Sequence, residues 1–303
     1  MIDRACLSIN NSCNLHCRYC NFRQTDMITN DEKLNKADID SILHNILEYS
    51  QKNNISLFKM GIVGAGEPFL NFDIIEYIIE YVKHEDLNNI FTFYTITNGT
   101  LMNHDILAFL YENRKRITLN FSLDGYEELH NYGKEAFQKT LNGIKQYEAV
   151  FKEKPVLNCT VSRQTLENKE AVVDYFIKNG FQKVNFSLLV DVEDQNLIIT
   201  YKEFQDFLQY VNGTNSIVFR QNRKDKKHDC RTYGQLCGVG RTNIFITKQG
   251  IYPCCRFYKN ETYKIANSDA DLFEVESNML KNIKPVTDGK CYYNEHIMNR
   301  SNL

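Results

Sequence analysis

Three cysteines fall within eight residues near the start of the sequence, in the run CNLHCRYC at residues 13–20. Thiolates are soft ligands that suit iron–sulfur clusters, zinc or copper(I). Three thiolates on one short loop can hold three corners of a four-iron cluster and leave the fourth iron open to another ligand. We therefore take Cys13, Cys17 and Cys20 as candidate metal ligands, because an iron with an open position is a place where chemistry can occur.

Two simpler interpretations of this loop stay open at this point. Two of the cysteines could form a disulfide, or all three could join a distant histidine in a structural zinc site. Zinc sites usually combine two Cys-x2-Cys pairs, and Cys17 with Cys20 has no second such pair anywhere in the sequence. The spacing therefore favours a cluster over zinc.

Composition limits the class of protein. The 303-residue chain is long enough for one large α/β domain, with or without a small appendage, and its net charge of -2 provides no broad basic surface for nucleic acid. Residues 1–4 do not begin an apolar signal segment, so the ten cysteines indicate metal-bound thiols in a reducing cytoplasm rather than a secreted disulfide scaffold. No run has the apolar length that spans a membrane, so we expect neither nucleic acid nor membrane as a partner.

Strand and helix patterns alternate through the first two thirds of the chain. The apolar segments at residues 5–9, 55–63, 90–97, 117–123, 156–161 and 184–189 are typical of strands, and helices are expected at 39–47, 72–83, 104–112, 136–151, 166–179 and 201–211. Alternating elements favour parallel pairing with right-handed crossovers. Six units are too few for a closed eight-fold barrel. We predict an α/β fold, a partial (β/α)6 barrel at residues 1–212.

The alternation stops near residue 213. A hairpin is expected at residues 243–247 and 251–253, and a short helix with a Ser or Asp cap at 268–280. Half of the ten cysteines fall between Cys230 and Cys291. We predict a small cysteine-rich C-terminal extension at residues 213–303. Cys6 and Cys159 lie within predicted strands, and we interpret them as small core residues.

The Cys-x3-Cys-x2-Cys spacing, with the aromatic Tyr19 before the third cysteine, closely resembles the signature of radical S-adenosylmethionine (SAM) enzymes. The resemblance implies that Cys13, Cys17 and Cys20 bind a 4Fe-4S cluster whose open iron takes the amino and carboxylate groups of SAM. It also implies reductive cleavage of SAM to a 5′-deoxyadenosyl radical, which abstracts hydrogen from a substrate C–H bond. A protein reductant such as flavodoxin or ferredoxin is then a partner.

Motifs at the predicted strand ends extend this resemblance. The run GAGEP at residues 64–68 resembles the Gly-Gly-Glu-Pro segment that binds the SAM amino group, with Ala65 in place of the second glycine. The runs TNGT at 97–100 and SLDG at 122–125 match segments that approach the ribose and carboxylate of SAM, although alone each is an ordinary turn sequence. The residues that the resemblance implies for SAM binding are Tyr19, Gly64, Gly66, Glu67, Asn98, Ser122, Asp124 and Leu188. Lys134 and Arg163 are candidates for the SAM carboxylate, and ordinary core packing is the alternative for Leu188.

The C-terminal cysteines resemble the SPASM/twitch extension of some radical SAM enzymes, whose cysteines bind auxiliary iron–sulfur clusters. Five cysteines favour the twitch arrangement with one auxiliary 4Fe-4S cluster, and a zinc ribbon is the alternative. The resemblance implies the ligands Cys230, Cys237, Cys254 and Cys291. Cys255 or His296 could replace Cys230 as the fourth ligand, or the fourth position could stay open.

The run YPCC at residues 252–255 resembles that of radical SAM peptide epimerases, in which a cysteine returns a hydrogen atom to the substrate. Cys255 is thus a candidate catalytic residue, with a buried inert thiol as the alternative. The resemblance implies modification of a ribosomally made peptide, such as epimerisation or cross-linking. A radical SAM dehydrogenase acting on a small metabolite and a non-catalytic iron–sulfur protein are the two other functions considered.

Overall fold

The computed structural model describes residues 1–20, 22, 32–189, 192–217, 238–239, 241–258 and 260–283. Within them, eight strands form one sheet in the order β6-β5-β4-β3-β2-β1-β7-β8. The strands are β1 (Arg4–Leu7), β2 (Phe58–Ile62), β3 (Phe91–Thr97), β4 (Ile117–Ser122), β5 (Val156–Val161), β6 (Val184–Leu188), β7 (Asn243–Thr247) and β8 (Gly250–Tyr252).

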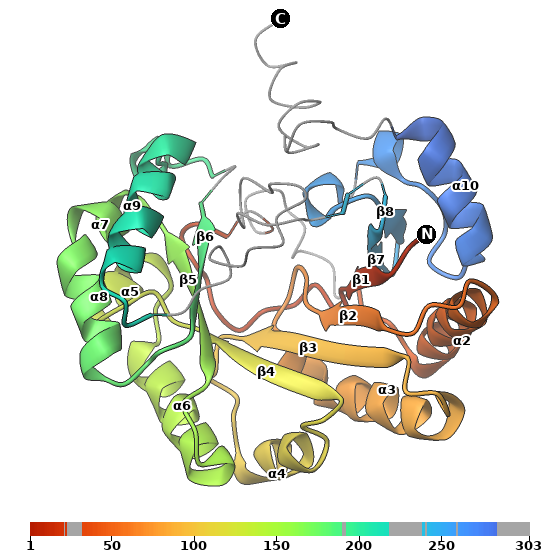
Figure 1. Ribbon diagram of the computed structural model, residues 1–303, viewed down its shortest axis with the longest axis horizontal. Helices are drawn as coiled ribbons and strands as arrows, with labels where there is room; N and C mark the ends of the chain where they lie inside the picture. The colour runs from red at the N-terminus through yellow and green to blue at the C-terminus, as the bar shows by residue number, and fades with distance from the viewer. Residues whose placement is uncertain are drawn as a thin grey trace, which may run out of the picture.

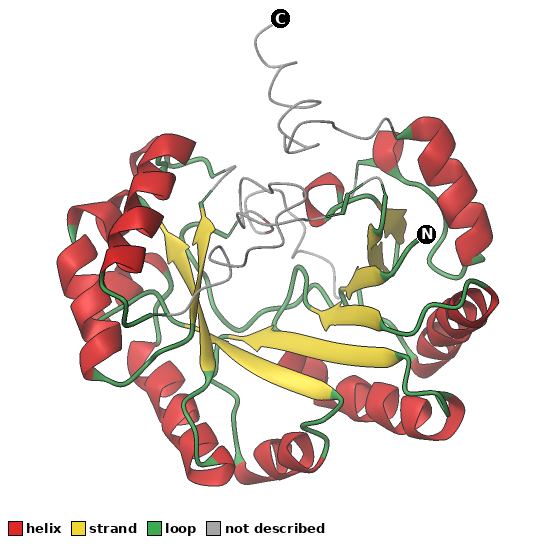
Figure 2. Ribbon diagram, viewed as in Figure 1, coloured by secondary structure: helices red, strands yellow, loops and turns green. Residues whose placement is uncertain are grey.

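Helices line the outer side of the curved sheet (Figures 1 and 2). They are α2 (Lys36–Lys52), α3 (Phe72–Glu85), α4 (His104–Glu112), α5 (Glu127–Gly133), α6 (Phe137–Phe151), α7 (Arg163–Glu167), α8 (Lys169–Lys178), α9 (Tyr201–Gly213) and α10 (Leu272–Asn282). Strands β1 to β6 are all parallel and lie in chain order. The predicted partial (β/α)6 barrel is therefore confirmed.

The burial pattern of the strands shows which face of the sheet packs against the helices. In β3, Phe91, Phe93, Thr95 and Thr97 are buried, whereas the three residues between them are only half-buried. Because side chains alternate between the two faces of a strand, one face packs under the helices and the other faces the concave side of the barrel.

The two cysteines predicted to be core residues differ in burial. Cys159 is fully buried in the helix-covered core, as predicted. Cys6 is half-buried instead, and its Sγ lies 3.6 Å from Tyr94 Oη.

Three features of the fold were not expected from the sequence. Helix α5 follows β4 after a short turn, and the helix predicted at residues 166–179 is two helices, of which α7 begins with a capping box between Ser162 and Thr165. The predicted hairpin exists, but β7 pairs in parallel with β1, so β7 and β8 continue the barrel sheet. The boundary at residues 212 and 213 stays a prediction.

The C-terminal helix α10 is joined to the start of the chain. Asp271 caps it by accepting a hydrogen bond from Phe273 N (2.7 Å), which agrees with the predicted Asp cap. Glu276 of α10 accepts a hydrogen bond from Tyr49 Oη (2.8 Å) and pairs with the Met1 amino group. None of the helices in the described ranges has the length and apolar character needed to cross a membrane.

Candidate active site

The three-cysteine loop leaves the C-terminal end of β1 and crosses the ends of the neighbouring strands. A turn brings Cys20 N to 3.1 Å from Cys17 O, and all three cysteines are half-buried. Burial raises the pKa of the Cys17 thiol to about 12, and the nearby Cys20 and Cys13 add to the increase. The described cysteines form no disulfide. Three neighbouring thiols on one loop fit a cubane cluster, in which each thiolate binds a different iron. Across the described ranges, no three His, Cys, Asp or Glu side chains converge as the ligands of one metal ion do.

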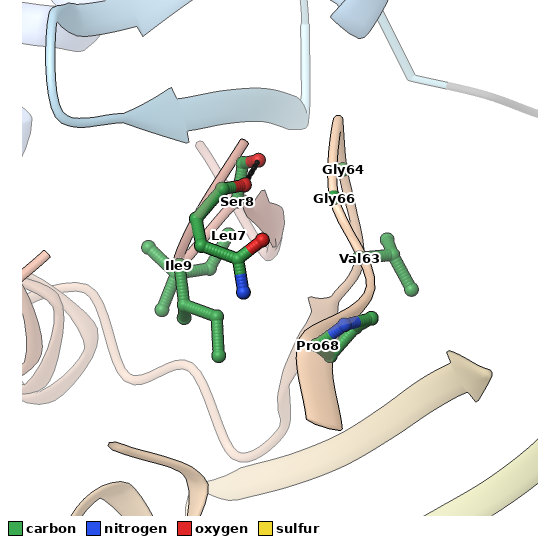
Figure 3. Close-up of a pocket in the computed structure, with 8 residues that line it drawn as sticks. Leu7, Ser8, Ile9, Val63, Gly64, Gly66 and Pro68 are labelled. Atoms are coloured by element: carbon green, nitrogen blue, oxygen red, sulfur yellow. Dashed lines mark hydrogen bonds between the residues drawn. The ribbon is translucent and has the colours of Figure 1, made fainter. Parts of the chain in front are cut away.

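The GAGEP segment packs directly against the chain that leads into this loop (Figure 3). A Cβ on Gly64 would collide with Ser8, and one on Gly66 would collide with Asn10 and the carbonyl of Ser12. Ala65 N donates to Ser8 Oγ (3.1 Å) and Glu67 N donates to Ser12 O (2.8 Å). The two glycines thus allow the segments after β1 and β2 to approach each other, which positions the cysteine loop.

Glu67 is 3% exposed, and its carboxylate accepts hydrogen bonds from the protein itself. The donors are Thr97 Oγ1 (2.7 Å), Asn98 N (2.8 Å) and Phe69 N (3.3 Å). Burial raises the Glu67 pKa to about 7, and these donors oppose the increase because they favour the ionised form. Glu67 therefore joins the end of β2 to the end of β3.

Asn98 connects the end of β3 to the cysteine loop. Its Nδ2 donates to Asn14 Oδ1 (2.9 Å), and Asn14 Nδ2 donates to Thr100 Oγ1 (2.8 Å). Thr100 Oγ1 in turn donates to Asn98 Oδ1 (2.7 Å). Because Asn14 follows Cys13 directly, this ring of hydrogen bonds fixes the start of the loop over β3.

A buried ion pair lies at the end of β4. Lys134 and Asp124 are 5% and 4% exposed, with Nζ 3.3 Å from Asp124 Oδ2. Lys134 Nζ also donates to Ser122 Oγ (2.8 Å), and Tyr19 Oη donates to Asp124 Oδ2. Burial acts to raise the Asp124 pKa, but the Lys134 cation and the donated hydrogen bonds hold it below its usual value. Tyr19, Ser122 and Asp124, three predicted site residues, are thereby brought together.

Helix α5 is the support for the second half of the loop. Arg18 N donates to Gly133 O (2.8 Å), and a Cβ on Gly133 would collide with the Tyr19 ring. The Arg18 guanidinium stacks 4.7 Å from the centre of the Tyr132 ring. A small pocket lies between this helix end and β5, lined in part by Tyr19, Asp124 and Thr160. Sequence reasoning missed this helix, although Glu127 and Glu128 in its first turn are a helix-start signal.

The comparisons with known proteins decide the family. The family model described as the Radical SAM superfamily matches residues 7–195, a span that holds the cysteine loop, the GAGEP segment and the ends of β3 to β6. The chain belongs to the radical SAM superfamily. Membership implies a 4Fe-4S cluster and SAM as cofactors.

Two curated relatives share much of this radical SAM chain. An uncharacterized protein of Methanocaldococcus jannaschii is 29% identical over 261 residues, which cover 82% of this chain and 83% of that protein. The radical SAM cyclopropyl synthase TigE of Paramaledivibacter caminithermalis is 26% identical over 275 residues, which cover 82% of this chain and 56% of TigE. The chain thus matches little more than half the length of TigE.

Solved structures share the fold of this radical SAM chain. Native anSMEcpe with bound AdoMet has a TM-score of 0.75 at 18% identity, covering 96% of this chain and 86% of that one. Streptococcus suis SuiB bound to its precursor peptide SuiA has a TM-score of 0.70 at 18% identity, covering 96% and 69%. At such identities the likeness shows a common fold.

The remaining residues predicted for SAM binding take different places. Arg163 pairs with Glu203 (2.5 Å) and donates to Ile198 O (3.2 Å). Leu188 is buried in the helix-covered core, which is the alternative that the sequence left open. Its contact with adenine stays a prediction, as do the SAM contacts of the other residues.

The first part of the C-terminal extension lies close to the cysteine loop of this radical SAM chain. Cys254 and Cys255 follow β8 and are half-buried, and Phe257 N donates to Cys254 O (3.0 Å). Tyr258 Oη donates to Glu32 Oε2 (3.4 Å), and Glu32 N donates to Asn11 Oδ1 (3.1 Å). The proposed ligands Cys230, Cys237 and Cys291, and the alternative His296, lie outside the described residues.

Proposed function

We propose that this chain is a radical SAM enzyme that modifies a ribosomally made peptide. The observation that carries the proposal is the three-cysteine loop fixed over the ends of β2, β3 and β4, within a fold that solved peptide-bound relatives share. SuiB is bound to its precursor peptide in one of these structures, and anSMEcpe is bound to the Cp18Cys peptide in another. A peptide substrate is therefore the class that the comparisons support best.

When bound, the cluster supplies the electron that cleaves SAM reductively and so starts hydrogen abstraction from the substrate. The protein holds and orients the groups that take part. Cys13, Cys17 and Cys20 are the ligands, and Asn14 and Asn98 hold the start of the loop. Lys134 holds Ser122 and Asp124 at the end of β4, where both are proposed to contact SAM.

The proposal is tested by the products of SAM cleavage. Protein reconstituted anaerobically with iron and sulfide, given SAM and dithionite, should release 5′-deoxyadenosine and methionine. Cys17→Ala should abolish this release, because the cluster loses one of three ligands. Wild-type protein that is fully loaded with iron and releases no 5′-deoxyadenosine contradicts enzymatic function.

We propose that the extension holds one auxiliary 4Fe-4S cluster, with Cys254 as one ligand beside Cys230, Cys237 and Cys291. Wild-type protein should then carry about eight iron atoms per chain, and Cys254→Ser about four. About four in the wild type, with SAM cleavage intact, contradicts the auxiliary cluster and leaves the first cluster in place.

We propose Cα epimerisation as the modification, with Cys255 as the hydrogen donor. Abstraction of the Cα hydrogen leaves a carbon radical, and the Cys255 S–H bond then breaks to give the new Cα–H bond and a thiyl radical. One electron from the reductant and one proton from solvent restore the thiol.

In heavy water, deuterium should appear at the peptide Cα with wild-type protein and disappear with Cys255→Ala. The same deuterium incorporation in Cys255→Ala contradicts its role as donor. A metabolite product oxidised by two electrons, with no peptide modified, supports the dehydrogenase instead.

A further inference from the structure

The concave face of the barrel has two chemically different halves. On β2 and β3 the residues on this face include Gly61, Tyr94 and Ile96, and the exposed Lys59 lies over the Tyr94 ring. On β4, β5 and β6 this face also carries six uncharged polar residues: Asn120, Ser122, Asn158, Thr160, Asn185 and Ser187. Their neighbours in sequence, such as Leu157 and Phe186, are buried in the helix-covered core. By the alternation of a strand, the polar residues therefore face inward.

The strand register brings these polar residues side by side. Asn158 of β5 is the register partner of Ser122 on β4 and of Asn185 on β6. Asn120 lies two residues before Ser122 on β4, so it is on the same face and nearer the N-terminal end of the strand. Neighbouring strands are about 4.8 Å apart, so Asn158 and Asn185 present adjacent carboxamides on one surface. We call Asn120, Asn158 and Asn185 the asparagine wall.

The asparagine wall holds an unsatisfied polar atom. Asn158 Nδ2 is buried and has no hydrogen-bond partner in the described ranges. A buried donor without a partner is costly, because it has lost its hydrogen bonds to water, so such a group is expected to meet a ligand. Asn120, which is 8% exposed, is also among the few buried polar residues of the inner face.

The charge around the wall limits which ligand fits. Among the Lys and Arg side chains of the described ranges, Lys134 is the buried one, and it is already paired with Asp124 and bonded to Ser122. An uncharged wall does not neutralise a phosphate or carboxylate, whose burial without a counter-charge is costly. A carboxamide offers donors and an acceptor, which match the C=O and N–H of a peptide bond.

We propose that the asparagine wall binds main-chain amides of the peptide substrate and so selects a peptide over an anionic metabolite. This inference rests on the peptide-modifying function proposed above. It assigns Asn158 and Asn185, together with Asn120 nearer the N-terminal end of β4, as residues that bind the substrate backbone. Recognition of the substrate side chains is left to other parts of the chain.

The test uses the full chain, reconstituted anaerobically and saturated with SAM. The probe is a library of short random-sequence peptides displayed on their own mRNA, and the Kd of each enriched peptide is measured for wild type, Asn158→Leu and Asn185→Leu. Leucine has the same branched skeleton of side-chain heavy atoms as asparagine but forms no side-chain hydrogen bond. We expect the peptide Kd to rise about tenfold in each variant, while the SAM Kd stays within about twofold.

A second measurement asks whether the main chain is the group that is bound. N-methylation of single peptide bonds should weaken binding to wild type at one or two positions, and cause no further loss at the same position in Asn158→Leu, because the two changes remove one interaction. Asn142→Leu, on the exposed side of α6, is the matched control and should bind like wild type.

Three outcomes overturn the inference. Equal peptide affinity in wild type, Asn158→Leu and Asn185→Leu shows that peptides bind elsewhere, and the proposed function survives. Loss of SAM affinity with unchanged peptide affinity assigns the wall to SAM. Absence of any enriched peptide from a wild-type protein that cleaves SAM removes the peptide function and the inference together.

Discussion

Lys134 joins three parts of the site at the scale of single residues. Its ammonium pairs with Asp124 and donates to Ser122, and its backbone carbonyl lies 4.0 Å from Cys17 Sγ. Removing one member of a buried ion pair leaves the other charged and unpaired, which typically costs 3–5 kcal/mol. The neighbouring Tyr19 would lose the geometry of its bond to Asp124 as well.

Lys134→Met should therefore lower the free energy of unfolding by about 3–5 kcal/mol, measured by urea denaturation of the protein without iron. The iron retained after gel filtration should fall in parallel. Lys202→Met is the matched control, because Lys202 pairs with Asp206 on the exposed surface of α9 and such pairs contribute at most about 1 kcal/mol. An unfolding free energy equal to that of Lys202→Met would show that the buried pair does not hold this site together.

His130 provides a second prediction at this scale. It is fully buried, its Nδ1 accepts a hydrogen bond from Asp124 N (3.3 Å), and its Nε2 lies 3.1 Å from Glu135 O. Burial, reinforced by the Lys134 cation, lowers its pKa from 6.5 to about 4. The unfolded chain therefore binds a proton near pH 6.5 that the folded chain accepts only near pH 4, so stability falls as the pH falls through this window.

Between pH 7.5 and 5.5 the His130 contribution to the unfolding free energy should fall by about 1 kcal/mol. His130→Gln should remove this part of the pH dependence, whereas His104→Gln, at an exposed site on α4, should not. Urea denaturation at the two pH values measures both. An unchanged pH dependence in His130→Gln would assign the titration to other groups.

At the scale of elements, the contact between the segments after β1 and β2 positions the cysteine loop. The collision expected at Gly66 involves the backbone carbonyl of Ser12, which cannot rotate away as a side chain can. Ser12 directly precedes Cys13, so any displacement of this carbonyl also moves the first predicted ligand. The glycines of the GAGEP segment are thus explained by chain packing, in addition to any contact with SAM.

Gly66→Ala should destabilise the fold by about 1–3 kcal/mol and lower the iron content after reconstitution. Gly213→Ala, at the end of α9 where a Cβ meets no atom within 4 Å, is the matched control. It should be neutral or stabilising by up to about 1 kcal/mol, since alanine is the better helix former. Normal stability and iron content in Gly66→Ala would contradict the packing role.

The sequence predicted the six parallel strands but neither helix α5 nor the strand with which the hairpin pairs. The six parallel strands were predictable because each is a short apolar run between amphipathic helices. Helix α5 has only seven residues, too few for a period of 3.6 to be recognised. The hairpin was recognised, but its pairing with β1 was not, because a local pattern does not specify which distant strand it joins.

The sequence predicted candidate site residues but not the partners that they bind within the chain. The family signature identified Cys13, Cys17 and Cys20, but it did not show that Glu67 is surrounded by three donors of its own chain. Nor did it show that Lys134 is held by Asp124 while Arg163 is held by Glu203. Hydrogen-bond partners such as these become known only when the strand ends are brought together.

At the scale of the whole molecule, one sheet connects the cysteine loop, the asparagine wall and the first part of the extension. β1 lies between β2 and β7, so the strand that leads into the loop contacts the barrel on one side and the hairpin on the other. Tyr258 and Glu32 add a contact between the segment after the hairpin and the segment after the loop. The strand that leads into the cysteine loop is therefore shared by the barrel and the hairpin.

We expect Cys13, Cys17 and Cys20 to hold a cluster to which SAM binds directly. This expectation is tested most directly by electron paramagnetic resonance of the dithionite-reduced Cys254→Ser variant, in which the first cluster is the only one expected. Addition of SAM should shift the signal of the reduced cluster, and Cys17→Ala should remove both the signal and the shift. A reduced 4Fe-4S signal that SAM leaves unchanged would contradict the account.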